Sequence, residues 1–211
     1  MEPDAVEIRV VACLIEKQRT TPDVYPLSVN ALRLACNQST NRDPVVSYDE
    51  ETVVEALRRL ALRGWTRLAS GSGSRARKYR HLLDEALDVD GPQISLLAVL
   101  MLRGPQTPGQ LKQRSDRLHG FADLGAVHEA LDGLVERGLV CRHERQPGQK
   151  EDRYEQLLGS AAAGGAAPPV AAPGGDGEAV PGAEGRIERV ERELAELRQQ
   201  LETLWAELGG G

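Results

Sequence analysis

An internal repeat constrains the fold of this chain more than any other feature. Residues 53–64 read VVEALRRLALRG and residues 127–138 read VHEALDGLVERG, so the motif EALxxLxxRG recurs 74 positions later. Each copy continues with a short β-like run, a glycine-containing break, a second run that holds a tyrosine, and two leucines. The order helix, helix, helix, hairpin is typical of a winged helix, so the sequence predicts two winged-helix domains in tandem.

The predicted fold class is mainly α with small β wings. The repeat places the first domain at residues 1–88 and the second at 89–158. Helices of the first domain are expected at 5–18, from 28 onward and at 49–64, with hairpin strands at 65–70 and 76–82. Helices of the second are expected at 93–102, from 107 and after 123, with strands at 139–145 and 152–157.

The composition changes sharply after the second domain. Residues 159–185 hold 21 glycine, alanine or proline residues among 27, which predicts a flexible linker that buries no core. Residues 186–208 then carry apolar side chains spaced alternately three and four apart. This heptad pattern predicts an amphipathic coiled-coil helix.

The apolar stripe of that helix has nothing next to it in the sequence to bury it, which favours self-association into a homodimer. An alternative is that the helix folds back on the two domains. The predicted dimer interface consists of Ile187, Val190, Leu194, Leu197, Leu201, Leu204 and Leu208.

A basic stretch between residues 58 and 80 is the strongest electrostatic feature. It contains no acidic residue, although residues 1–158 as a whole are nearly neutral, with 22 basic and 23 acidic side chains. In a winged helix this stretch is the end of the third helix plus the wing, where basic side chains commonly neutralise phosphates. The candidate nucleic-acid contacts in and near the first domain are Arg42, Arg58, Arg59, Arg67, Arg75, Arg77, Lys78 and Arg80.

Two observations keep other interpretations open. The stretch could instead be an ordinary solvated hairpin, with some of its arginines paired with acids on the first or third helix. The third helix also begins with Asp49, Glu50 and Glu51, and these carboxylates would repel phosphates in a major groove while complementing the helix dipole. The second domain mixes both charges in its hairpin, which is more typical of a spacer or a protein-binding half.

Several longer strings are more specific than the repeat. TTPDVYPLSVNAL at 20–32, ACNQSTNRDPV at 35–45 and GSRARKYRH at 73–81 resemble the YceH family of bacterial tandem winged-helix proteins, as do LRGPQTPGQL at 102–111 and RQPGQKEDRY at 145–154. The resemblance covers residues 5–158. It implies a cytoplasmic protein with two winged helices and often a helical tail. It does not indicate what the protein does.

The loop at 37–43 is rich in side chains that form hydrogen bonds. Asn37, Gln38 and Asn41, with Arg42 beside them, could recognise a base edge or a partner peptide. The alternative is that they satisfy buried backbone groups and fix a long loop.

No pattern in the sequence indicates catalysis. The four histidines are scattered, Cys141 and His143 lack a second ligand pair at zinc-site spacing, and Gly71–Ser74 lacks the lysine and helix of a P-loop. We expect no enzyme activity, no metal and no cofactor. Wide spacing of three cysteines indicates free thiols in the cytoplasm, and no apolar run is long enough for a membrane.

The sequence therefore leads to two hypotheses about function. In the first, the chain is a regulatory protein that binds duplex DNA through the basic wing of its first domain and dimerises through its tail. In the second, the tandem winged helices are a scaffold that binds a protein partner and not DNA. The charge of the wing favours the first, and the acidic start of the third helix favours the second.

Overall fold

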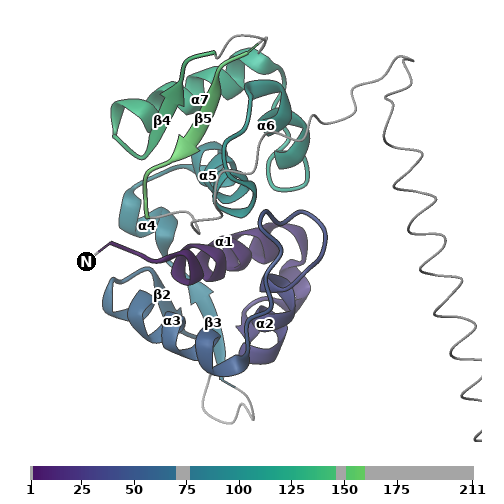
Figure 1. Ribbon diagram of the computed structural model, residues 1–211, viewed down its shortest axis with the longest axis vertical. Helices are drawn as coiled ribbons and strands as arrows, with labels where there is room; N and C mark the ends of the chain where they lie inside the picture. The colour runs from purple at the N-terminus through teal and green to yellow at the C-terminus, as the bar shows by residue number, and fades with distance from the viewer. Residues whose placement is uncertain (1, 70–76, 146–150, 160–211) are drawn as a thin grey trace, which may run out of the picture. The chain divides into compact units, whose positions relative to one another are not determined.

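Helices make up most of the ordered framework, together with two small antiparallel sheets (Figure 1). The computed structural model describes residues 2–69, 77–145 and 151–159, all of which belong to one compact unit. The predicted coiled-coil helix and nearly all of the predicted linker lie outside the described residues.

The first half of the unit contains three helices and a three-stranded sheet. Its elements are α1 (Ala5–Thr20), the 3-10 turn η1 (Pro22–Val24), β1 (Leu27–Ser28), α2 (Val29–Cys36), α3 (Glu50–Leu62), β2 (Thr66–Leu68) and β3 (Lys78–His81). Strand β3 lies in the middle of the sheet and pairs antiparallel with both β1 and β2.

The second half repeats this order. Its elements are α5 (Gly91–Arg103), α6 (Pro108–Ser115), α7 (Leu124–Glu136), β4 (Val140–His143) and β5 (Arg153–Gln156). A bridge from Gln106 to Tyr154 precedes α6, as the pairing of Leu27 with Tyr79 precedes α2. Helix α4 (Leu83–Leu87), which the sequence analysis missed, connects the halves. The domain boundaries remain predictions.

Local signals in the sequence account for the helix starts. Asp4 caps α1 and forms a capping box with Glu7, and Thr107 does the same for α6 with Gln110. Asp49 caps α3 as expected. The bounds differ by a few residues: α1 continues to Thr20, α5 begins at Gly91, and both hairpins have shorter strands than predicted.

The glycine of the repeated motif ends the third helix in each half. Gly64 has a φ of 74° and Gly138 a φ of 67°, in the left-handed region that favours glycine. Each glycine turns the chain away from the helix and into the first hairpin strand, which explains why the motif repeats as RG followed by a β-like run.

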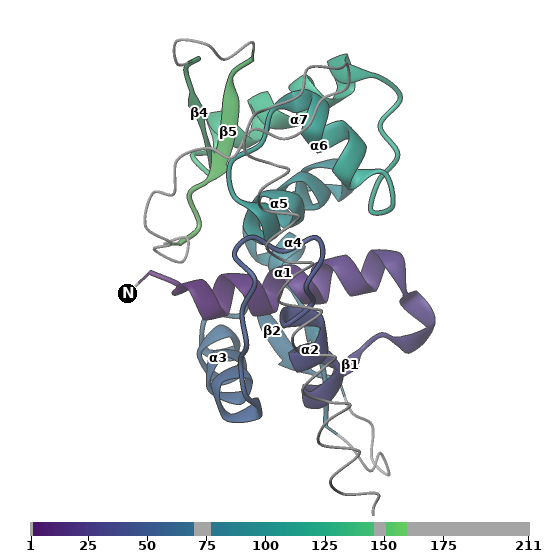
Figure 2. The same ribbon diagram turned by 45° about the vertical axis from the view of Figure 1, so that its right-hand side comes forward.

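Helix α1 is the centre of the unit. All nine residues from Glu7 to Ile15 are buried, so this part of the helix has no solvent face. It packs against α2 and α3 of its own half and also against α5 of the other half. Both views show α1 lying between α3 and α5 (Figures 1 and 2). The two halves therefore share this helix as a common core element.

None of the helices in the described part of the chain combines the length and apolar character that a membrane crossing requires.

Candidate nucleic-acid interface

The outer face of the first sheet gathers part of the predicted basic surface. Arg67 of β2 lies directly opposite Arg80 of β3, and Lys78 lies two residues before Arg80. Because side chains alternate across a strand, these three side chains share one face. Tyr79 and His81 alternate with them and face α1 and the core, where His81 is buried. Arg67 and Lys78 are exposed, and so is the neighbouring Arg77.

Two like charges directly opposite each other destabilise an antiparallel pair. One acid partly offsets this at Arg80, whose Nη2 lies 3.3 Å from Glu85 Oε1 on the exposed surface. Among the described residues no acid pairs with Arg67 or Arg77. An anion such as a phosphate placed over this face would relieve the repulsion between Arg67 and Arg80.

The basic residues of α3 are arranged differently. Arg58 binds Glu55 in a fork, and its Nη2 lies 2.8 Å from Oε1. Arg59 lies 2.7 Å from Asp4, and Arg63 lies 3.0 Å from the buried carboxylate of Glu7. These three arginines therefore pair with acids, and the pairs of Arg59 and Arg63 join the end of α3 to the start of α1.

The first turn of α3 remains acidic and exposed. Glu50 and Glu51 follow the capping residue Asp49, whose carboxylate accepts a hydrogen bond from the backbone of Thr52. As the sequence indicated, the acidic first turn of α3 repels phosphates and therefore disfavours the binding of this helix end in a DNA groove.

Arg42 does not belong to the exposed basic surface. Its guanidinium has no exposed side-chain area and binds both oxygens of Glu16, at 2.6 and 3.1 Å. It also donates to the carbonyl oxygens of Ala35 and Asn41 and to the Gln38 amide oxygen. The expectation of a phosphate contact at Arg42 is corrected: packing of the 37–43 loop against α1 buries this side chain.

The amide side chains of the same loop have internal partners. The side chain of Asn37 donates to the carbonyl oxygen of Tyr48 and accepts from its N–H, both at 2.8 Å. These bonds hold together the two ends of the connection between α2 and α3. Gln38 binds Arg42, and Asn41 adopts a positive φ of 61° and accepts from Arg103. These contacts favour the loop-fixing interpretation over base recognition for Asn37. Asn41 is exposed and borders a cavity.

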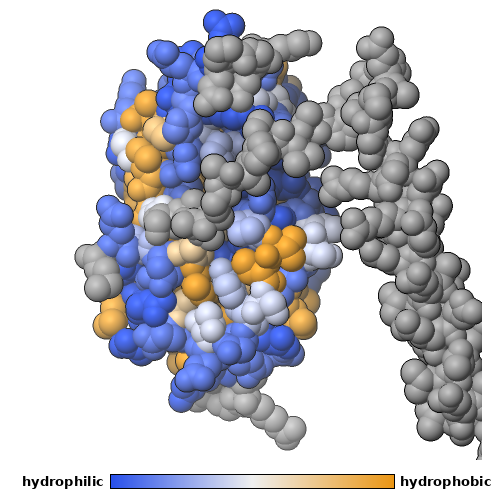
Figure 3. Space-filling view, in the orientation of Figure 1, coloured by the Kyte–Doolittle hydropathy of each residue, from blue (hydrophilic) through white to orange (hydrophobic). Residues whose placement is uncertain are grey.

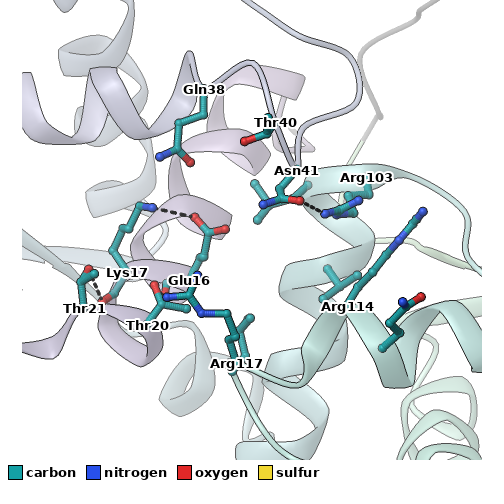
Figure 4. A pocket seen from close by; sticks show the side chains of 14 residues that line it. Glu16, Lys17, Thr20, Thr21, Gln38, Thr40, Asn41, Arg103, Arg114 and Arg117 are labelled. Carbon is teal, nitrogen blue, oxygen red and sulfur yellow. Dashed lines mark hydrogen bonds and ion pairs between the residues drawn. The ribbon is translucent and has the colours of Figure 1, made fainter.

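That cavity is a feature that sequence reasoning missed. It has a volume of about 600 Å³ and is formed by α1, the loop after α2, α5 and α6. Glu16 and Lys17 line one side, Arg103 and Arg114 line the other, and Arg117 closes the bottom (Figure 4). No sequence pattern could have predicted this group of charged side chains, because they come from α1, α5, α6 and the turn after α6.

His81 is a structural residue. Burial lowers its pKa to about 4, against the influence of Asp84, so the ring is neutral at pH 7. Its Nε2 lies 2.6 Å from Gln18 Oε1, which makes Nε2 the protonated nitrogen, and Nδ1 accepts from Leu83 N–H. The histidine therefore fixes β3 to α1 and adds no charge to the sheet.

Cys141, His143 and Glu155 meet on the second hairpin. His143 Nε2 lies 3.3 Å from the sulfur and 2.7 Å from Glu155 Oε2, and the three ligand atoms lie within 4.8 Å of one another. They could supply three of the four ligands of a zinc site. Burial and the charge of Glu155 raise the pKa of the Cys141 thiol, which disfavours the thiolate that a metal needs. The expectation of no metal stays a prediction.

The thiols themselves are free. Cys13 and Cys36 are buried, whereas Cys141 is only partly buried. Arg75 and the seven residues of the predicted dimer interface lie outside the described residues. On the face seen in Figure 3, apolar side chains form small separate groups among hydrophilic ones.

Comparisons with known proteins give one consistent family. Residues 4–149 match a family described as "Protein of unknown function, DUF480". A relative from Pelobacter propionicus, named UPF0502 protein, is 46% identical over 200 residues, which cover 94% of this chain and 91% of the relative. One from Stenotrophomonas maltophilia is 46% identical over 203 residues, covering 95% and 93%. One from Geotalea daltonii is 53% identical over 155 residues, covering 72% and 71%.

Proposed function

This chain belongs to the DUF480 (UPF0502) family, as its YceH-like motifs predicted, and we propose that it is a duplex-DNA-binding regulatory protein. The observation that carries the proposal is the shared sheet face of Arg67, Lys78 and Arg80, with exposed Arg77 beside it. Basic side chains gathered on one exposed face can neutralise the phosphates of a duplex.

We assign each half to the winged-helix fold. The support is the order of three helices and a hairpin, found twice, with the strand pairing before the second helix also found twice. In this assignment β2 and β3 are the wing of the first half, and α3 is its recognition helix.

The docking we propose is led by the sheet and not by α3. The exposed carboxylates at the start of α3 disfavour its entry into a groove, whereas the sheet presents basic side chains on one face. Contacts to phosphates position a protein without reading sequence, so we expect weak sequence preference from this surface alone.

Replacing Arg67, Arg77 and Lys78 together with alanine is expected to weaken DNA binding equally across sequences. Each lost phosphate contact reduces the magnitude of the slope of log affinity against log salt concentration by about 0.9. The magnitude therefore falls by about 3 if all three side chains contact phosphates. Fluorescence anisotropy with a random-sequence duplex at several salt concentrations measures both quantities.

A matched control removes three charges from the second hairpin, as Arg142→Ala, Arg145→Ala and Arg153→Ala. Arg142 and Arg145 pair with Asp152 there, so this variant should bind DNA as the parent does. Equal losses in both triple variants would show that net charge, and not the first sheet, governs binding. An unchanged slope in the first variant would refute the sheet-led interface.

A second candidate function is protein binding through α3. Val54 is 45% exposed and Leu62 is 77% exposed, and they lie with Glu51, Glu55 and Arg58 on one face of the helix. A mixed apolar and charged stripe of this kind suits a partner helix. Loss of partner binding in Val54→Asp, with DNA binding unchanged, would favour this candidate.

We also propose that the tail makes the protein a homodimer. A chain that ends at Gly159 keeps every described element and is expected to unfold at the same temperature as the full chain, but as a monomer. Leu197→Glu with Leu201→Glu in the full chain should give the same mass, because a seam does not tolerate unpaired carboxylates. Light scattering decides the matter, and equal masses for all three proteins would contradict tail-driven assembly.

No catalytic role is proposed for any residue, and the free buried thiols support a cytoplasmic location.

A further inference from the structure

The cavity formed by α1, α5, α6 and the loop after α2 has an unusual charge balance. Four basic side chains line it, from Lys17, Arg103, Arg114 and Arg117, against the single carboxylate of Glu16. Arg42 already neutralises that carboxylate by donating to both of its oxygens, and Lys17 Nζ lies 3.3 Å from Glu16 Oε2. The cavity therefore carries a surplus of positive charge.

The three arginines that line the cavity pair with no acid among the residues that the structure describes. Arg103 donates to the amide oxygen of Asn41 and Arg114 to that of Gln106, both of which are neutral. In the described part of the chain no acid pairs with Arg117. Burial lowers the pKa of Arg103, and the positive charges of Arg114 and Arg42 lower it further. Crowded cations of this kind are stabilised by an anion placed among them.

The remaining wall of the cavity suits an organic molecule. Val99, Leu102 and Leu118 provide apolar surface, and Thr20, Thr40 and Gln113 provide neutral hydrogen-bonding groups. The volume of about 600 Å³ lies within the range of small-molecule sites. Arginines bind phosphate oxygens through paired donors, and two of them on one side can span adjacent phosphates.

We propose that this cavity binds a small organic polyphosphate, the chemistry of a nucleoside diphosphate or triphosphate. Arg103 and Arg114, which lie on one side of the cavity (Figure 4), bind the phosphates, with Arg117 and Lys17 adding charge. The apolar wall receives the ring of the ligand. The site lies between elements of both halves and is separate from the sheet face proposed to bind DNA.

Isothermal titration calorimetry of the full chain tests the proposal, with ATP, tripolyphosphate and adenosine as probes at about 0.15 M salt. ATP is expected to bind one per chain, tripolyphosphate more weakly, and adenosine not at all. Arg103→Met or Arg114→Met should each weaken ATP binding roughly tenfold to a hundredfold, as the loss of a charge-assisted contact does. Arg117→Met, whose side chain has no ion pair to lose among the described residues, should weaken it roughly threefold to tenfold without affecting folding.

Lys112→Met is the matched control, because it removes a charge from α6 at a position that does not line the cavity. Its affinity for ATP should equal that of the parent, as should that of the sheet variant with Arg67, Arg77 and Lys78 replaced. No saturable binding of ATP or tripolyphosphate up to about 1 mM would overturn the proposal. An affinity for ATP equal to that of the parent in all three arginine variants would also overturn it. So would saturable binding of a single-stranded oligonucleotide alone, which would indicate that the cavity binds a nucleic-acid backbone instead.

Discussion

Replacing Arg42 with methionine is expected to lower the free energy of unfolding by about 3–5 kcal/mol, because it leaves a buried carboxylate without its partner. The side chain of Glu16 is only 13% exposed, and Arg42 provides two of its hydrogen bonds. The same change leaves the carbonyl of Ala35 without its donor. Urea denaturation followed by circular dichroism measures the loss.

Arg58→Met provides the control for this prediction. It also breaks a forked arginine–glutamate pair, but both partners are exposed on α3, and such pairs contribute little. Its stability should be close to that of the parent. A loss below about 1 kcal/mol for Arg42→Met would mean that the loop opens and lets Glu16 become solvated.

The Arg42–Glu16 pair also predicts a pH dependence. Burial alone would raise the pKa of Glu16, but the hydrogen bonds and charge of Arg42 outweigh it, so the pKa lies below its ordinary value. A lowered pKa means that the folded state binds its proton less readily than the unfolded state. The stabilisation is therefore complete above about pH 4.3 and is lost as the pH falls through the lower folded value. In Glu16→Gln this contribution to the acid sensitivity should disappear.

A chain that ends at Asp90 is expected to lose cooperative unfolding altogether. Residues Glu7–Ile15 of α1 are all buried, and α5 covers one side of them. Removing α5 exposes that side, and each fully buried aliphatic residue contributes about 1.5–3 kcal/mol. A few such losses reach the total stability of a small domain, about 5–15 kcal/mol.

The comparison is with the chain that ends at Gly159, which retains both halves. Thermal unfolding followed by circular dichroism should show a sharp transition for the longer chain and none for the shorter one. A sharp transition in the shorter chain would show that the predicted boundary between residues 88 and 89 separates two independently stable domains, despite the shared helix.

The charge on the surface shows where sequence reasoning stops. Eight basic residues between 58 and 80 look alike in the sequence. In the folded chain, Arg59 and Arg63 pair with Asp4 and Glu7, more than 50 positions away, while Arg67 pairs with no acid among the residues that the structure describes. Which arginine meets an acid depends on how α3 packs on α1, and no local pattern encodes that packing.

The sequence by itself determined the repeated order of three helices and a hairpin, the starts of α1, α3 and α6, and the glycines that end α3 and α7. These features depend on contacts within about four residues, such as a capping side chain and the N–H groups of the next turn. It also determined the family, through strings that need no structure to compare.

Only the tertiary structure decided which of these elements share a core and which charges face one another. All nine residues from Glu7 to Ile15 are buried, because α2 and α3 of the same half and α5 of the other half all pack against α1. Packing of the 37–43 loop against α1 buries Arg42, and the packing of α1, α5 and α6 gathers Lys17, Arg103 and Arg114 around one cavity. Long-range contacts of this kind arise from the shapes of whole helices, and a linear pattern of residues does not contain them.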